Sequence, residues 1–300
     1  MPDITASVGQ IVFPNPFLLA SGILDENGYT IRKILEEGAG GAVTKSIGLT
    51  ERRGYRPPIV VPLETGLLNA VGLPNPGIDE FSQEMVEATR AGKPVIGSIF
   101  AATPEEFLSL GEKMELYGAS AIELNLSCPH VKGVGSEVGS DPDLVGQIIS
   151  LLKKKLKIPV FSKLSPNVTD ILQIAEAASK SDCFVLINTV RGMAIDISAR
   201  KPILSNKVGG LSGRAIKQVG VRMVWDVFEN FDVPIIGVGG IETIEDALEY
   251  IMAGASAVQI GTAIYTRGRS IFRELENDLL AFLNREGMES IDPIIGVAHS

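Results

Sequence analysis

The stretch Ala121-Ile122-Glu123-Leu124-Asn125-Leu126-Ser127-Cys128 joins a short apolar segment to a polar end. Its first part has the alternation of a buried strand, and Pro129 then breaks the pattern. The loop that follows, residues 131–140, contains three glycines. Cys128 therefore stands at the end of a predicted strand, where a thiol can reach a substrate. The alternative is a small apolar residue that only closes the strand, since free cysteine is usually buried and inert.

Seven further segments share the short, β-branched character of residues 121–125, and each precedes a loop and a helical pattern. The predicted strands are residues 17–20, 41–45, 95–100, 121–125, 160–164, 184–188, 235–238 and 257–260. Most are apolar on both faces, as in a parallel sheet covered by helices. This α/β alternation predicts a (β/α)8 TIM barrel that spans residues 1–300 as a single domain. The alternative, an open doubly wound sheet, is disfavoured because no Gly-x-Gly-x-x-Gly follows the first strand.

Composition excludes several classes of function. A net charge of −9 and a pI near 4.9 disfavour nucleic acid and anionic membrane surfaces as partners. No apolar run reaches the roughly 18 residues of a membrane-spanning helix, and the start of the chain lacks the pattern of a signal peptide. Two cysteines, Cys128 and Cys183, and two histidines, His130 and His299, give no metal-ligand spacing. We expect a cytoplasmic protein without a metal, with Cys183 in the core and a mobile His299 near the end of the chain.

Polar and glycine residues gather where the predicted strands end, and that is the end at which TIM barrels place their active sites. Gly239-Gly240 and Gly261-Thr262 follow the last two strands, and Ser212-Gly213 lies in the preceding loop. Barrels often bind phosphate there, because glycines leave backbone N–H groups open. The sequence therefore predicts a phosphate site, although the same glycines could simply make tight turns.

Two lysines and several asparagines extend this predicted site. Lys45 and Lys163 follow apolar strands, and a buried lysine needs an anionic or hydrogen-bonding partner. That partner is either an anionic ligand or an internal carboxylate such as Glu123. Asparagines at 69, 75, 125 and 188 offer amides to a ligand with N–H and C=O edges. Residues 52–75 and 190–208 are too long for simple loops, and such insertions often serve binding.

These motifs together resemble the dihydroorotate dehydrogenase family along nearly the whole chain. The matching motifs are Asn15-Pro16, Ala20-Ser21-Gly22, Thr44-Lys45-Ser46, Asn69-Ala70-Val71-Gly72-Leu73-Pro74-Asn75, Asn125-Leu126-Ser127-Cys128-Pro129, Lys163-Leu164-Ser165-Pro166, Ile187-Asn188-Thr189, Gly210-Leu211-Ser212-Gly213, Gly239-Gly240 and Gly261-Thr262. Cysteine at position 128 resembles class 1 of the family, and residues 191–202 are similar to subclass B. The chain departs from the family pattern at His130, where asparagine is common, and at Arg214, where proline is common.

The resemblance implies an FMN enzyme that oxidises (S)-dihydroorotate to orotate in pyrimidine biosynthesis. Cys128 would be the general base that takes the C5 proton, with Lys45 beside it, and a hydride would pass from C6 to N5 of FMN. The implied FMN site consists of Ser21, Lys45, Ser46, Asn125, Lys163, Ile187, Gly213, Gly239, Gly240, Gly261 and Thr262. The implied substrate site consists of Lys45, Asn69, Ala70, Val71, Gly72, Leu73, Asn75, Asn125, Asn188 and Thr189. The loop at residues 131–140 would act as a lid.

The resemblance also implies a partner. Subclass B enzymes pair with a second subunit that carries FAD and a two-iron two-sulfur cluster and delivers electrons to NAD⁺, so we expect a homodimer that assembles into a heterotetramer. Fumarate, the acceptor of the other soluble subclass, is an alternative. Two other functions stay open on the residues alone: a phosphate-binding isomerase or lyase without flavin, and a non-catalytic scaffold.

Overall fold

The computed structural model describes residues 2–126 and 138–300. Eight parallel strands form a closed barrel in the order β10-β15-β16-β3-β4-β7-β8-β9. They are β3 (Phe17–Leu19), β4 (Gly41–Val43), β7 (Val95–Ile99), β8 (Ala121–Asn125), β9 (Val160–Leu164), β10 (Cys183–Leu186), β15 (Ile235–Val238) and β16 (Ala255–Ile260). The last strand pairs with the first, with Val258 opposite Phe17. The TIM-barrel prediction is confirmed, and the open sheet is excluded.

All eight predicted strands exist, although the two predicted at residues 41–45 and 184–188 end two residues earlier. Just beyond the end of each strand, the backbone still forms a hydrogen bond with the neighbouring strand. The Thr44 N–H donates to the Ile96 carbonyl, and the Asn188 N–H donates to the Leu164 carbonyl. Lys45 and Asn188 therefore lie in the first residues beyond the strands, at the end where the barrel opens.

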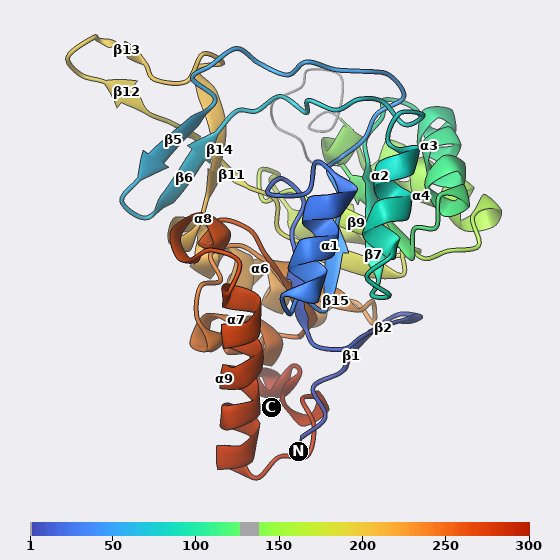
Figure 1. The fold of residues 1–300 in the computed structure, drawn as a ribbon, viewed down its shortest axis with the longest axis vertical. Coiled ribbons are helices and arrows are strands. Elements are labelled where there is room, and N and C mark those ends of the chain that lie inside the picture. The colour runs from blue at the N-terminus through green and yellow to red at the C-terminus, as the bar shows by residue number, and fades with distance from the viewer. Residues whose placement is uncertain (1, 127–137) are drawn as a thin grey trace.

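Helices cover the outside of the barrel (Figure 1). They are α1 (Gly28–Glu36), α2 (Ser82–Thr89), α3 (Pro104–Leu116), α4 (Pro142–Lys155), α5 (Ile171–Ala177), α6 (Lys217–Phe228), α7 (Ile244–Met252), α8 (Ala263–Arg267) and α9 (Ile271–Glu286). Two of them begin with a capping box. Thr103 and Glu106 form a capping box with Pro104 in the first turn of α3. Thr243 and Asp246 form a second capping box on α7.

Two apolar layers stabilise the barrel. A large one lies between strands and helices, and a smaller one fills the barrel between its strands. The hairpin of β1 (Ala6–Val8) and β2 (Ile11–Phe13) adds Phe13 to this inner layer. Cys183 also lies there, fully buried, and burial raises the pKa of its thiol. Its predicted role in packing is confirmed.

The two long insertions meet in a second, antiparallel sheet of order β11-β14-β6-β5. Its strands are β5 (Val60–Leu63), β6 (Gly66–Asn69), β11 (Val190–Met193) and β14 (Val208–Ser212). Leu68 of β6 pairs with Leu211 of β14, so the first insertion binds directly to the second. A short hairpin of β12 (Ile195–Asp196) and β13 (Lys201–Pro202) extends beyond this sheet, away from the barrel helices (Figure 1).

The two ends of the chain lie close together (Figure 1), and Asp3 forms a β-bridge with Ser290. The expectation that His299 is mobile is wrong. Its ring stacks on Trp225 with centroids 3.6 Å apart, and its Nε2 lies 3.1 Å from the Ala253 carbonyl oxygen. The indole of Trp225 on α6 and the Ala253 carbonyl just after α7 thus hold the His299 ring in place.

Candidate active site

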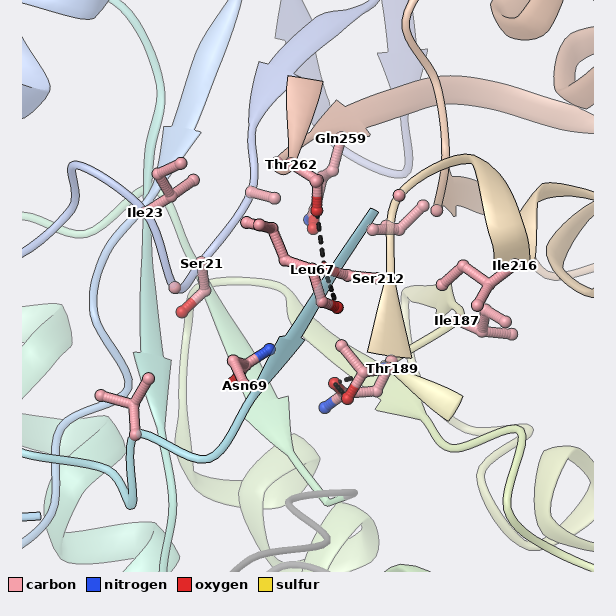
Figure 2. A pocket seen from close by; sticks show the side chains of 18 of the residues that line it. Ser21, Ile23, Leu67, Asn69, Ile187, Thr189, Ser212, Ile216, Gln259 and Thr262 are labelled. Carbon is pink, nitrogen blue, oxygen red and sulfur yellow. Dashed lines mark hydrogen bonds between the residues drawn. The ribbon is translucent and has the colours of Figure 1, made fainter. Parts of the chain in front are cut away.

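A cavity of about 520 Å³ opens at the carboxyl ends of the barrel strands, beneath the antiparallel sheet. Figure 2 shows side chains from both sheets directed around it, among them Ser21, Asn69, Thr189 and Gln259. The predicted site residues that line it are Ser21, Lys45, Ser46, Asn69, Val71, Gly72, Leu73, Asn125, Lys163, Ile187, Asn188, Thr189, Gly213, Gly239, Gly240, Gly261 and Thr262. The fold therefore brings together residues that are scattered over most of the sequence.

Two predicted substrate residues do not line this cavity. Ala70 is fully buried in a small apolar cluster with Val61 and Leu68. The Asn75 side chain accepts hydrogen bonds from the backbone N–H groups of Gly48 and Gly77, at 3.2 and 2.9 Å. The Asn75 amide therefore stabilises two loops. Pro74, Pro76 and Gly77 beside it are the residues in the sequence that indicate a turn at this position.

A buried polar cluster forms one wall of the cavity. The Lys163 ammonium donates to Glu123 Oε1 and to Gln259 Oε1, both at 3.2 Å. Gln259 in turn donates to Glu123 Oε2 at 2.7 Å, so both carboxylate oxygens are bound. The internal ion pair that the sequence left open for Lys163 is therefore present, in the cavity wall itself. The sequence analysis did not identify Gln259. The only indication in the sequence was that Gln259 is a single amide within the otherwise apolar end of β16.

Lys45 contributes a second cation to the lining. It is 7% exposed, and its Nζ lies 3.6 Å from Oε1 of Glu26, a side chain that is mostly in solvent. An exposed partner at this distance neutralises a cation weakly. A second carboxyl near Lys45 is that of Asp25, and burial disfavours its charge, so Lys45 is better placed than Lys163 to attract an anionic ligand.

Asp25, which sequence reasoning also missed, supports this side of the cavity. It is fully buried, and burial raises the pKa of its carboxyl while the nearby Lys45 opposes that shift. Its Oδ2 accepts from the Gly22 N–H at 2.6 Å and from the Ser21 hydroxyl at 3.3 Å. Asp25 thus fixes the turn that carries Ser21 into the cavity.

Asn125 presents an open acceptor. Its Nδ2 donates to the Ser46 hydroxyl at 2.9 Å, and that hydroxyl lies 2.8 Å from the Ser98 hydroxyl. Its Oδ1 is buried and has no hydrogen-bond partner among the residues that the structure describes. An unpaired buried amide oxygen costs about 1–3 kcal/mol, so a ligand N–H at this point would stabilise the site.

At the predicted phosphate site, three glycines form a cradle of backbone without side chains. Gly213, Gly239 and Gly240 have φ angles of 89°, 129° and 70°, which side chains rarely adopt. A Cβ at Gly240 would lie 2.7 Å from the Gly213 carbonyl oxygen, so glycine is required there sterically as well. Beside the cradle, the Thr262 hydroxyl donates to the Ser212 hydroxyl at 2.7 Å (Figure 2). Hydroxyls and open N–H groups in one place suit a phosphate.

The predicted base Cys128, His130 and most of the predicted lid lie outside the described residues. The described end of that loop forms a short turn, Val138–Ser140. Elsewhere in the described ranges there is no group of three or more His, Cys, Asp or Glu side chains that could hold a metal ion. Those ranges also contain no helix long and apolar enough to cross a membrane.

Known proteins resemble this chain over its full length. A sequence model of the family described as dihydroorotate dehydrogenase matches residues 4–283. The "Dihydroorotate dehydrogenase B (NAD(+)), catalytic subunit" of Thermoplasma acidophilum is 59% identical over 298 residues, with 99% of each chain covered. Proteins of the same name from Methanocaldococcus jannaschii and Pyrococcus horikoshii are 52% and 50% identical, with 99% and 96% of this chain and 98% and 95% of theirs covered.

A solved structure supports the fold. The DHODH of Eimeria tenella, crystallised with ferulenol, superposes with a TM-score of 0.87 at 24% sequence identity, covering 100% of this chain and 89% of that one. A sequence identity of 24% supports a shared fold and nothing further. The family model matches residues 4–283, and the three relatives named above are at least 50% identical over 96% or more of the chain. It belongs to the dihydroorotate dehydrogenase family.

Proposed function

We propose that this chain is the catalytic subunit of an NAD⁺-linked dihydroorotate dehydrogenase, which oxidises (S)-dihydroorotate to orotate in pyrimidine biosynthesis. The observation that carries the proposal is one cavity in which a glycine cradle, two lysines and an open amide acceptor meet. The full-length relatives with that printed name support the same activity. In this proposal residues 1–300 act as one catalytic domain.

The hydrogen-bonding groups that line the cavity match the groups that FMN would present. The glycine cradle suits a phosphate, and the open Asn125 Oδ1 suits a ring N–H. The residues that would hold FMN are Ser21, Lys45, Ser46, Asn125, Lys163, Ile187, Gly213, Gly239, Gly240, Gly261 and Thr262. When bound, FMN supplies an acceptor for a hydride.

The remaining lining is proposed to bind and orient the substrate. Lys45 would attract the dihydroorotate carboxylate, and Asn69, Asn188 and Thr189 would bind its amide edge; residues 71–73 complete the proposed set of lining residues. Ala70 and Asn75 do not line the cavity and would act from behind these residues. The Asn69 amide already donates to the Gly210 carbonyl at 3.2 Å, so its orientation is fixed before a ligand arrives. Fixed donors lower the entropy lost when a ligand binds.

Cys128 is the proposed general base. Its thiolate would accept the C5 proton while the hydride leaves C6, and the product is orotate. A free thiol titrates near pH 8.5 and is only a few per cent ionised at neutral pH. Turnover should therefore rise from neutral to alkaline pH. The loop at residues 131–140 is proposed to exclude water during transfer.

We further propose that a homodimer of this chain assembles in the cytoplasm with an electron-transfer subunit that carries FAD and a two-iron two-sulfur cluster, as a heterotetramer. The words "catalytic subunit" in the names of the relatives support a partner. Fumarate is the alternative acceptor, and assays with NAD⁺, with and without the partner, separate the two.

The first experiment is an anaerobic absorbance titration of the purified chain with dihydroorotate. Bleaching of a yellow flavin band, reversed by orotate or an oxidant, is expected. A yellow protein that does not bleach would support the proposed flavin but contradict dihydroorotate as the substrate. A colourless protein that cannot be reconstituted with FMN would reject the proposal and favour a phosphate-binding isomerase or lyase. Binding of FMN without turnover by any acceptor, unchanged by Cys128→Ala, would favour the scaffold.

A further inference from the structure

Tyr250 is a buried tyrosine of α7 whose hydroxyl reaches the end of strand β15. The ring is fully buried, and its hydroxyl oxygen lies 2.8 Å from the carbonyl oxygen of Gly239. The carbonyl oxygens of Val238 and Lys217 lie farther away, both at 3.3 Å. A hydroxyl carries one hydrogen, so its main acceptor is the Gly239 carbonyl.

Two glycines make room for this tyrosine. A Cβ at Gly220 of α6 would lie 1.9 Å from the hydroxyl oxygen, and a Cβ at Gly237 of β15 would lie 2.5 Å from the ring. Neither position could carry a side chain without moving the ring. The close contacts with α6 and β15 therefore fix the position of the Tyr250 ring and of its hydroxyl.

The helix that carries Tyr250 is itself fixed at its start. Asp246 accepts from the N–H groups of Glu242 and Thr243, both at 3.0 Å. Lys217 of α6 donates to Asp246 at 2.7 Å and forms an ion pair with Glu249 at 3.0 Å. These contacts join α6 and α7 directly beside the turn that follows β15.

The direction of one peptide group links Tyr250 to the cavity. In a trans peptide the C=O and the next N–H point in opposite directions. A Gly239 carbonyl held toward Tyr250 therefore turns the N–H of Gly240 away from the protein core. Gly240 lines the cavity, so this N–H faces the space where the cradle would receive a phosphate.

We propose that Tyr250 is a positioning residue for the phosphate cradle: its hydroxyl holds the Gly239 carbonyl and so aims the Gly240 N–H at the cofactor phosphate. This inference rests on the proposed FMN site. Tyr250 itself does not line the cavity, whereas Gly239 and Gly240, the residues of the turn that its hydroxyl contacts, do. The competing explanation is that the ring only fills space between α6 and β15.

The test compares two flavins that differ by the phosphate. Tyr250→Phe removes one oxygen and keeps the ring. Flavin is removed from the wild-type and variant proteins, and the affinities for FMN and riboflavin are then measured by fluorescence quenching. We expect FMN affinity to fall about three- to tenfold, the usual worth of one hydrogen bond, with riboflavin affinity unchanged. Tyr117→Phe, which removes a hydroxyl at the far end of α3, is the matched control and should change neither affinity.

An equal fall for both flavins would assign Tyr250 to packing and overturn the inference, and so would two unchanged affinities. A wild-type protein that binds neither flavin would instead overturn the proposed function, and this inference with it. Gly220→Ala provides a second route if Tyr250→Phe does not fold, since the added methyl displaces the hydroxyl while the tyrosine stays. It should lower FMN affinity selectively in the same way, and an unselective loss in a folded protein would contradict the inference.

Discussion

Lys163 and Glu123 form a buried ion pair between neighbouring strands β9 and β8, with 3.2 Å between Nζ and Oε1. Because Gln259 binds the other carboxylate oxygen, the carboxylate is satisfied on both sides. Breaking such a pair from one side leaves a buried charge without compensation. The pair therefore has consequences for both stability and cofactor binding.

Lys163→Met should lower the free energy of unfolding by about 3–5 kcal/mol, because Glu123 stays buried and unpaired. Lys163→Met combined with Glu123→Gln should lose less than the sum of the two single changes. Urea unfolding of the flavin-free proteins measures this. Arg222→Met, which breaks the exposed pair with Asp226, is the control and should cost under about 1 kcal/mol. Strict additivity at the buried pair would show that the two charges do not interact.

Lys163→Ala should also weaken FMN binding or slow flavin reduction, because it removes a cation from the cavity wall. Flavin affinity and the anaerobic reduction rate by dihydroorotate are the measurements. If both equal the wild-type values, Lys163 is a structural residue only.

Cys128→Ala should slow the reductive half-reaction by about 10²–10⁴, the usual size of a general-base contribution. Cys183→Ala is the matched control, since that thiol lies in the inner core of the barrel and should leave the rate unchanged. Stopped-flow reduction by dihydroorotate, recorded between neutral and alkaline pH, measures both variants. A loss below about tenfold for Cys128→Ala would refute its assignment as the base.

The loss of folding stability at acidic pH should depend in part on Asp246. Burial disfavours its charge, but the Lys217 ammonium and the N–H groups of Glu242 and Thr243 outweigh burial and hold its pKa below the ordinary value of 3.8. A lowered carboxyl pKa stabilises the folded protein above the ordinary value, and that contribution is lost as the pH falls through the folded pKa. Asp246→Asn should therefore cost about 1 kcal/mol at neutral pH. The difference from wild type should shrink below about pH 4; a constant difference in urea midpoints across this range would contradict the prediction.

Gly240→Ala should reduce FMN affinity at least tenfold. The new methyl would lie 2.7 Å from the Gly213 carbonyl oxygen, so the two glycines of the cradle would have to move apart. Gly268→Ala is the control, because Gly268 has a similar φ of 75° but open space around its Cβ position. Backbone strain is thus common to the two variants, and only Gly240→Ala places a methyl against the backbone of the cradle. Equal flavin affinities in both would place the phosphate elsewhere.

The barrel could be predicted because its strands are local features. Residues 121–125, 160–164 and 235–238 are short apolar runs between turn and helix signals, and the structure gives them the predicted bounds. The positions of Gly239 and Thr262 in the cavity followed from the rule that barrel sites lie at strand ends.

The antiparallel sheet could not be predicted in the same way. The lengths of the two insertions indicated that each holds structure, but the pair of Leu68 and Leu211 joins positions separated by nearly half of the 300-residue chain. Gln259 was missed for a related reason, because its partners Lys163 and Glu123 become neighbours only after folding. Asp25 was missed although its partner Ser21 is only four residues away, because nothing in the local sequence shows that its carboxyl is buried.

The link between β6 and β14 also sets an order of events during synthesis. Asn69 and Gly210, which it joins, are 141 residues apart, so a growing chain exposes the β5–β6 hairpin long before its partner strand exists. Such an unpaired edge invites association with other chains, and distant contacts of this kind slow folding. The upper wall of the cavity is therefore completed only when about two-thirds of the chain has been made. The cavity residues Gly239, Gly240, Gly261 and Thr262 follow β15 and β16 and are made later still, so the complete cavity is available to a ligand only after nearly the whole barrel has been synthesised.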